Sequence, residues 1–176
     1  MKTLKIIGLV IAVIIAIPLI IALFVKKDYV VERSITINKS KADVFNFVRY
    51  LKNQDRYSKW VNLDPAMKKE FRGTDGQPGF VYAWNGNSDA GQGEQEIKNV
   101  SDGKLDVEVR FIRPFESVAQ APMTTEEVSP TQTRVKWAMT GKNGYPMNFM
   151  NLFMDGMIGK DLEEGLTNLK RVMEGS

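Results

Sequence analysis

The sequence contains no cysteine and no histidine among its 176 residues. These absences exclude disulfide bonds, thiolate nucleophiles, imidazole general bases and the Ser-His-Asp triad. They also exclude the usual zinc sites, whose ligands are thiolates and imidazoles. Any catalytic chemistry therefore has to use carboxylates, lysine, arginine, tyrosine, serine or threonine. Because a thiol is dispensable in both reducing and oxidising compartments, the missing cysteines leave the redox compartment open.

Excess positive charge is also missing from most of the chain, although the net charge of the whole sequence is +3. Four of the 24 Lys and Arg residues, Lys2, Lys5, Lys26 and Lys27, flank the first apolar segment. The other 20 and all 21 acidic residues lie within residues 28–176, so this part of the chain carries a net charge near −1. Since nucleic-acid binding needs a basic face, we expect no nucleic-acid partner.

Residues 6–25 form one uninterrupted apolar run that contains only apolar residues, Gly and Pro. Twenty residues span about 30 Å as a helix, which matches the hydrocarbon core of a bilayer. A cleaved signal peptide usually has a shorter apolar region followed by small residues, and IALFVKKDY offers no such site. We therefore expect residues 1–27 to form an uncleaved, single-pass transmembrane anchor with basic flanks, in which Pro18 introduces a kink.

Basic residues lie on both sides of this anchor and bear on its orientation. Lys26, Lys27, Arg33, Lys39 and Lys41 follow the apolar run, whereas Lys2, Lys5 and the amino terminus precede it. Because flanking Lys and Arg residues favour the cytoplasmic side, the count leans slightly towards a cytoplasmic domain.

Beyond the anchor, residues 28–176 have the pattern of an α+β domain. Residues 29–37 alternate like a strand, and Ser40 begins a capping box that opens a short amphipathic helix. A further short helical piece is expected over residues 55–60, before Asp64-Pro65 breaks it. Six more strand-like runs, joined by short turns, predict an antiparallel meander: MKKEFRG, FVYAWNG, GEQEIKNV, KLDVEVRFI, VAQAPMTTEEV and TRVKWAMTG.

From Pro146 onward the apolar residues recur three or four positions apart, which predicts a long C-terminal helix with one apolar side. The strands before it have one apolar and one wet face, best seen where Leu105, Val107 and Val109 alternate with charged residues. Because the apolar face of a sheet has to be covered, we expect the terminal helix to pack on it.

Residues 85–96, NGNSDAGQGEQE, have the oxygen-ligand spacing of an EF-hand calcium loop. However, the first, sixth and eighth positions hold Asn85, Ala90 and Gln92, and the flanking residues alternate like strands rather than helices. A phosphate-binding loop is disfavoured too, because the glycines do not lead from a strand into a helix. We interpret this stretch as a hairpin connection and expect no metal.

Several of these stretches resemble a known family. Trp60, GTDGQPG, FVYAWNGN, GQGEQEI, VRFIRPF and TRVKWAMTG, in an order of strand, helices, strands and long C-terminal helix, resemble the START-like helix-grip superfamily (SRPBCC), specifically its polyketide cyclase/dehydrase group. The resemblance covers about residues 29–174. It implies a START/Bet v1-like α+β fold in which an antiparallel sheet wraps around the terminal helix. The enclosed cavity holds lipids, sterols, polyketides or other apolar small molecules in relatives.

The alternation assigns a set of side chains to the inner face of the sheet and to the apolar side of the helix. The candidate ligand-binding residues are Tyr82, Trp84, Gln95, Phe111, Trp137, Met139, Phe149, Phe153 and Met157. Aromatic and Met side chains give large, adaptable apolar contacts, and the indole N–H and phenol O–H groups can orient a ligand. The same residues can instead fill an ordinary core.

The carboxylates of the domain are weaker candidates. On the same alternation Glu94 and Glu96 point outward, where Arg110 or Lys98 can neutralise them. Asp155 and Asp161 are expected at the surface or edge of the terminal helix, and Asp161 gains interest only if it is buried. No catalytic residue and no cofactor is therefore expected.

Three functions remain open. The leading hypothesis is a membrane-anchored domain that binds an apolar small molecule or lipid. The second is a cyclase- or dehydratase-type enzyme acting on a hydrophobic substrate through Tyr, a Trp-held water or a carboxylate. The third is a protein-interaction module whose cavity is filled by its own side chains.

Overall fold

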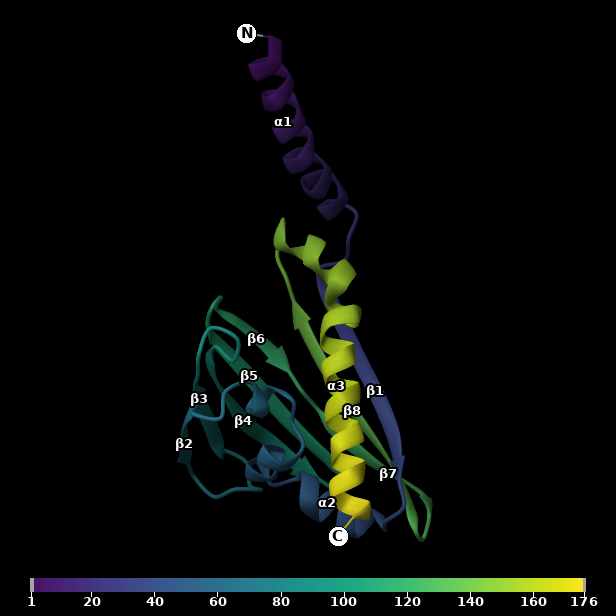
Figure 1. Cartoon of the computed structure of the whole chain (residues 1–176). Coiled ribbons are helices and arrows are strands. Elements are labelled where there is room, and N and C mark those ends of the chain that lie inside the picture. The colour runs from purple at the N-terminus through teal and green to yellow at the C-terminus, as the bar shows by residue number, and fades with distance from the viewer. Residues whose placement is uncertain (1, 176) are drawn as a thin grey trace.

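A computed structural model describes residues 2–175, save for the side chains of residues 2 and 4, and shows one helix projecting from an α+β domain (Figure 1). Residues 1 and 176, the outer ends of the two expected regions, lie outside the described part. Helix α1 (Lys2–Ala22) contains Pro18 and is long and apolar enough to cross a membrane, a property that signal sequences share. It ends three residues before the apolar run does, because residues 23–25 form a turn.

Eight antiparallel strands form one sheet in the order β1-β8-β6-β5-β4-β3-β2, and β7 pairs with β5 and β8. Successive strands pair from β2 to β6, and β6 and β7 both lie between β5 and β8, which confirms the predicted meander; β1 closes the sheet against β8. The strands are β1 (Asp28–Ile37), β2 (Lys68–Arg72), β3 (Val81–Asn85), β4 (Gln92–Ser101), β5 (Lys104–Arg113), β6 (Ser117–Gln120), β7 (Met123–Ser129) and β8 (Gln132–Lys142).

One predicted strand is divided in the structure. The run VAQAPMTTEEV becomes β6 and β7, separated at Ala121 and Pro122. Proline has no N–H to donate to a ladder, so the chain leaves the regular pairing there. The flanking backbone groups still bond across the break: Ala121 N donates to Val107 O at 2.7 Å, and Ala138 N donates to Pro122 O at 3.0 Å.

Three short helices connect β1 to β2, and a short and then a long helix follow β8. They are α2 (Lys41–Val48), η1 (Leu51–Arg56), η2 (Trp60–Leu63), η3 (Met147–Met150) and α3 (Asn151–Glu174). The capping box at Ser40 forms, because its hydroxyl accepts a hydrogen bond from Asp43 N at 3.2 Å. The single helical piece expected at residues 55–60 is replaced by the two 3-10 turns η1 and η2.

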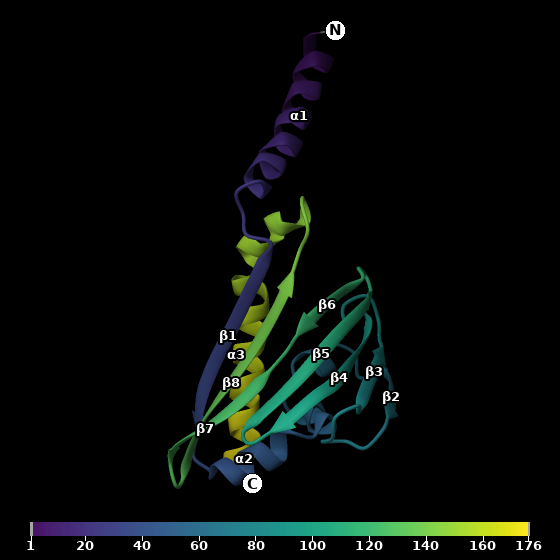
Figure 2. The same cartoon turned by 180° about the vertical axis from the view of Figure 1, so that it is seen from behind.

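Helix α3 lies across the inner face of the sheet, and the view from behind shows the strands in front of it (Figure 2). Its fully buried leucines, Leu162, Leu166 and Leu169, pack with Trp137 and with α2 in one core cluster. Gly165 permits this contact, since a Cβ atom there would lie 2.8 Å from the Trp137 ring. The α+β helix-grip architecture expected from the sequence is therefore confirmed.

Truncating a side chain on the buried side of α3 should destabilise the domain. We expect Leu162→Ala to reduce the free energy of unfolding by about 2–5 kcal/mol, because it leaves a cavity at a fully buried site. The measurement is urea denaturation of the full chain in detergent, followed by the fluorescence of its three tryptophans, all of which lie in the domain.

Leu152→Ala on the same helix is the matched control. Leu152 is 55% exposed, so we expect a change within about 0.5 kcal/mol. Equal losses at the two leucines would mean that α3 does not bury the face described above.

Candidate functional site

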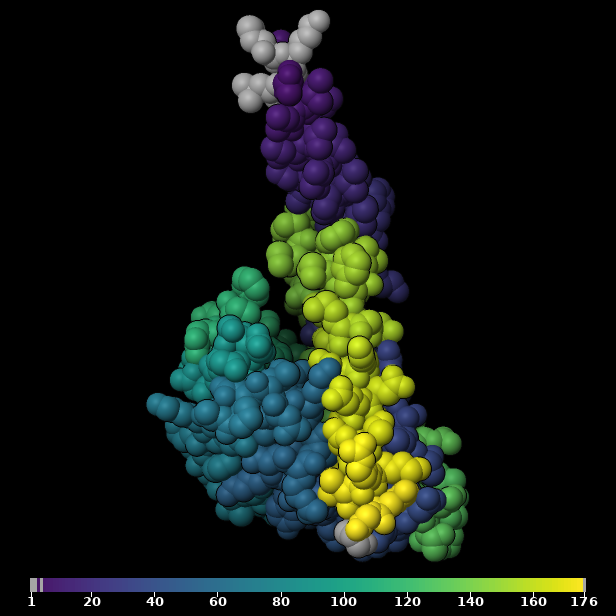
Figure 3. All heavy atoms as spheres, in the orientation of Figure 1, coloured from purple at the N-terminus to yellow at the C-terminus, as the bar shows by residue number. Residues whose placement is uncertain are grey.

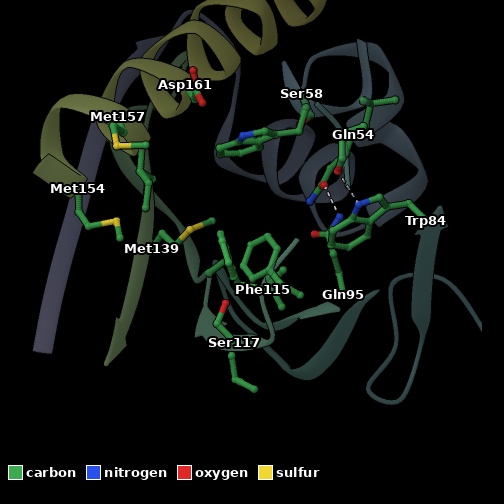
Figure 4. Close-up of a pocket in the computed structure, with 18 of the residues that line it drawn as sticks. Gln54, Ser58, Trp84, Gln95, Phe115, Ser117, Met139, Met154, Met157 and Asp161 are labelled. Atoms are coloured by element: carbon green, nitrogen blue, oxygen red, sulfur yellow. Dashed lines mark hydrogen bonds between the residues drawn. The ribbon is translucent and has the colours of Figure 1, made fainter. Parts of the chain in front are cut away.

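A cavity of about 430 Å³ lies between the sheet, the first half of α3 and the η1–η2 region (Figure 4). The sheet contributes mainly aromatic and aliphatic side chains from β3, β4, β5 and β8. Helix α3 contributes Met154, Met157, Ile158 and Asp161, which follow the pattern i, i+3, i+4, i+7 and so share one side of the helix. The cavity wall is thus mostly apolar, with a few polar groups at defined places.

Seven of the nine residues proposed from the sequence line this cavity. They are Tyr82, Trp84, Gln95, Phe111, Trp137, Met139 and Met157. The strand register explains the agreement, since Tyr82 pairs with Gln95 and Gln95 pairs with Val109, so their side chains point to the same face.

Phe149 and Phe153 lie outside the cavity lining. Phe149 belongs to η3, before α3 begins, and the two rings pack edge to face with their centroids 5.6 Å apart. Phe153 is 49% exposed, because it precedes Met154 by one position and falls on the neighbouring side of the helix. The structure therefore separates these two residues from the other seven.

The sequence reasoning missed two groups of lining residues. The first group is Gln54, Ser58, Trp60 and Val61, from η1, η2 and the residues between them, and the second is Pro114, Phe115, Ser117 and Val118, from the β5–β6 connection and the start of β6. Neither segment has the regular alternation that assigns faces in a strand. The one available signal was Trp60, a large apolar side chain in a short polar segment.

Two side-chain amides, that of buried Gln54 and that of half-buried Gln95, face each other in the cavity wall. Gln95 Nε2 donates a hydrogen bond to Gln54 Oε1 at 2.9 Å (Figure 4). Among the described residues, neither Gln54 Nε2 nor Gln95 Oε1 has a hydrogen-bond partner. Because an amide can make up to four hydrogen bonds, this pair retains a donor and an acceptor for a ligand.

The indole N–H and phenol O–H groups expected to orient a ligand already donate hydrogen bonds within the protein. Trp84 Nε1 donates to Ala90 O at 3.1 Å, and the Tyr82 hydroxyl donates to Asp55 Oδ1 at 2.8 Å. Burial, and then the bond to Asp55, raise the pKa of Tyr82 above its ordinary range. Burial also raises the pKa of Tyr29, which lines the same cavity. Both phenols therefore keep their protons at neutral pH and do not act as bases.

Asp161 lies at the edge of the cavity as one partner of an ion pair. Its carboxylate accepts from Lys59 Nζ at 2.8 Å, and Glu164 contacts the same ammonium at 3.0 Å. The side chain of Asp161 is 27% exposed, which agrees with the expected edge position. These contacts, with that from Asp161 the larger, raise the pKa of Lys59, so its ammonium stays charged and is not an amine nucleophile.

The stretch at residues 85–96 is the β3–β4 hairpin, as predicted. Gly91 has a φ of 66°, and a Cβ atom there would lie 2.5 Å from Arg113 O. Gly93 pairs with Trp84, and a Cβ atom on it would lie 2.6 Å from that indole ring. The glycines thus shape the hairpin and allow Trp84 to lie over it as part of the cavity wall. Among the described residues, no group of three or more Asp or Glu side chains could hold a metal ion.

Glu94 and Glu96 point away from the cavity, as expected. Both contact Arg110 on the outer face of the sheet, at 2.7 and 2.8 Å, and Glu108 joins the same cluster. The bond from Arg110 is the main cause that lowers the pKa values of Glu94 and Glu108, whereas Lys98 and then Arg110 lower that of Glu96. These carboxylates form a charged outer face and not an acid/base pair.

The sequence matches one family model over most of its length. The model described as "Polyketide cyclase / dehydrase and lipid transport" matches residues 29–174. A search of curated proteins finds no match.

Solved structures share the fold of the domain at low sequence identity. Norcoclaurine synthase from Thalictrum flavum, in complex with dopamine and hydroxybenzaldehyde, has a TM-score of 0.64 at 11% identity and covers 89% of this chain and 92% of its own. Ara h 8.0201 has a TM-score of 0.59 at 11% identity, with 85% and 99% covered. A protein from Thermobifida fusca has a TM-score of 0.61 at 16% identity, with 82% and 92% covered. These likenesses support the fold alone.

The charged outer face predicts a specific pH dependence. The pKa values of Glu94, Glu96 and Glu108 are lowered in the folded state, so their pairing stabilises the protein above the ordinary glutamate pKa and is lost as pH falls through the lowered values. We expect Arg110→Gln to cost about 1 kcal/mol at pH 7 and progressively less below about pH 4, measured by urea denaturation at several pH values.

Arg113→Gln on the same strand is the matched control, because Arg113 bonds the neutral side chains of Gln92 and Asn85. Its effect should not change with pH over this range. A loss at Arg110→Gln that stays constant from pH 7 to pH 3.5 would contradict the assigned ion pairs.

Proposed function

Because the chain belongs to the polyketide cyclase / dehydrase and lipid transport family, we propose that residues 28–176 bind an apolar small molecule or lipid between the sheet and α3. The observation that carries this proposal is the cavity of about 430 Å³, with an apolar wall and an incompletely bonded pair of amides. Ligand sites typically combine such a wall with a few polar groups that fix orientation. The open volume disfavours the alternative of an interaction module filled by its own side chains.

The size of the cavity favours a compact ligand. Its volume equals that of about 14 water molecules, each of which occupies ~30 Å³ in the liquid. A single acyl chain or a small fused-ring compound fits this volume, whereas both chains of a diacyl lipid do not. The ligands in the printed description of the norcoclaurine synthase structure, dopamine and hydroxybenzaldehyde, are compact in the same sense.

The polar groups favour binding over turnover. The Tyr29 and Tyr82 phenols have raised pKa values, and Lys59 is held as a cation by Asp161 and Glu164. A general base or amine nucleophile needs a pKa closer to the working pH. The amides of Gln54 and Gln95 do not titrate, but they can bond a carbonyl or hydroxyl on an otherwise apolar ligand.

The apolar run at residues 6–25 supports a role as a membrane anchor within residues 1–27. A tether would keep the cavity close to a bilayer that dissolves apolar molecules and so raise their effective concentration without any new contact. The greater number of basic residues after the run favours a single-pass protein of the cell membrane with its domain on the cytoplasmic side.

Filling the cavity should prevent ligand binding. We expect Ala121→Phe to abolish most of the apolar adduct that co-purifies with the full chain, because Ala121 lines the cavity and the larger ring occupies its volume. The measurement is native mass spectrometry of protein released from detergent, with analysis of organic extracts to identify the compound.

The matched control is Ala83→Phe. Ala83 pairs with Glu70 and Glu94 and so lies on the outer face of the sheet, where added bulk should leave the adduct unchanged. Ser117→Trp, at the cavity edge, serves as a second filling variant if Ala121→Phe does not fold. An unliganded wild-type chain that also ignores a panel of fatty acids and fused-ring compounds would refute the proposed function.

A further inference from the structure

Hydrogen bonds join the end of α1 to the domain. Asn148 Nδ2 donates to Ala22 O at 2.6 Å and to Val25 O at 2.8 Å. Asn151 Nδ2 donates to Lys26 O and Lys27 O, both at 2.9 Å. Ala22 O is one of the last carbonyls of α1, which lack intrahelical partners, and the other three acceptors belong to the segment that joins α1 to β1. Asn148 is 1% exposed, and this buried joint fixes the direction in which α1 leaves the domain.

Exposed apolar side chains surround this joint. Tyr145, Met147 and Phe153, which we call the collar, are 50%, 57% and 49% exposed and lie in or beside η3 and the first turn of α3. Figure 1 shows this segment at the end of the domain from which α1 projects. The collar therefore adjoins the end of the apolar run.

The cavity opens at the same end of the domain. Phe115 and Met157, which we call the mouth residues, line the cavity although they are 77% and 58% exposed. They come from the β5–β6 connection and from α3, and Figure 3 shows a hollow between these two elements on the side that faces α1. A molecule that enters or leaves would pass between them.

We propose that the collar and the mouth residues form a second, peripheral contact with the lipid bilayer, so that the cavity opens towards lipid. This inference rests on the proposed function, because it supplies the route by which an apolar ligand would reach the site. The joint is essential to the argument, since a flexible linker would leave the orientation of the domain undefined.

The surroundings of the collar fit a bilayer better than a protein partner. Lys26, Lys27 and Lys142 are exposed, and the pairing of Lys142 with Asp28 places all three close to the joint. Lysines that flank an apolar surface attract anionic headgroups. Tyr145 adds an amphipathic ring of the kind enriched where membrane proteins cross the interface.

The position of the mouth suits exchange with lipid. An apolar ligand that passes directly from acyl chains to Phe115 and Met157 keeps its surface out of water, so it avoids the cost of hydration on the way. Exposed apolar side chains beside a cavity are otherwise unfavourable in water. One contact surface thus accounts for both the collar and the mouth.

The absence of cysteine makes a site-specific test possible in the full chain. Single variants Phe115→Cys, Met147→Cys and Val128→Cys would be labelled with an environment-sensitive fluorophore and reconstituted into vesicles of phosphatidylcholine and phosphatidylglycerol. Val128 is the control for Phe115, because it is also an exposed apolar side chain, at 48%, and lies in β7, at the end of the sheet away from α1 (Figure 1). Quenching by nitroxide-labelled lipid and by aqueous iodide would be compared.

We expect lipid-borne nitroxide to quench the labels at 115 and 147 severalfold more than the label at 128, with iodide giving the opposite order. Equal quenching at the three positions would overturn the proposal. Labels at 115 and 147 that are shielded from both quenchers would also overturn it, and would indicate a protein contact instead.

These outcomes are independent of whether a ligand is bound. A bilayer contact in a chain that holds no apolar molecule would contradict the proposed function but support the proposed contact. If the apolar adduct is lost in Ala121→Phe but the labels all face water, the proposed function is supported and the proposed contact is contradicted.

Discussion

The candidate site depends on how α3 packs on the sheet. The buried residues of this helix begin at Gly159 and continue to Met173, so its second half is held tightly against β1, β8 and α2. Before Gly159 the same side of the helix carries Met154, Met157 and Ile158, which are only partly covered. One straight helix therefore acts as a core element at one end and as a cavity wall at the other. The volume that a ligand could fill exists because the first half of α3 is packed less closely on the sheet than the second half.

The position of Trp137 connects the two halves. Its ring contacts α3 at Gly165, packs edge to face with Tyr57 and Trp60, and also lines the cavity. Because Tyr57 and Trp60 come from the segment between α2 and β2, the same ring fixes η1 and η2 over the open side of the sheet. Stability and the shape of the cavity are thus coupled through one side chain. A substitution at Trp137 would change both, which is why a clean test of binding uses other positions.

Regular periodicity determined what the sequence could predict. Alternation in β3, β4, β5 and β8 identified the inward faces, and the register Tyr82–Gln95–Val109 shows why the prediction succeeded there. It could not place Gln54 or Phe115, because a 3-10 helix of six residues is too short to show its period and a connection has none. It also assigned Phe153 to the same side as Met157, since a stripe of apolar residues on a helix does not show which of its edges faces the cavity. The extent of the cavity, the amide pair and the joint at Asn148 all depend on contacts between distant segments.

The arrangement of polar groups gives the cavity a direction. The amides of Gln54 and Gln95 belong to η1 and β4, whereas the exposed mouth residues belong to α3 and the β5–β6 connection. A ligand with one polar end would place that end on the amides, because an apolar wall offers it no hydrogen bond and burying it unpaired is costly. Its apolar remainder would then extend towards the mouth. If the mouth faces a bilayer, the apolar end would be the first part to leave and the last to enter, so the strength of the amide contact would set how long the ligand stays bound.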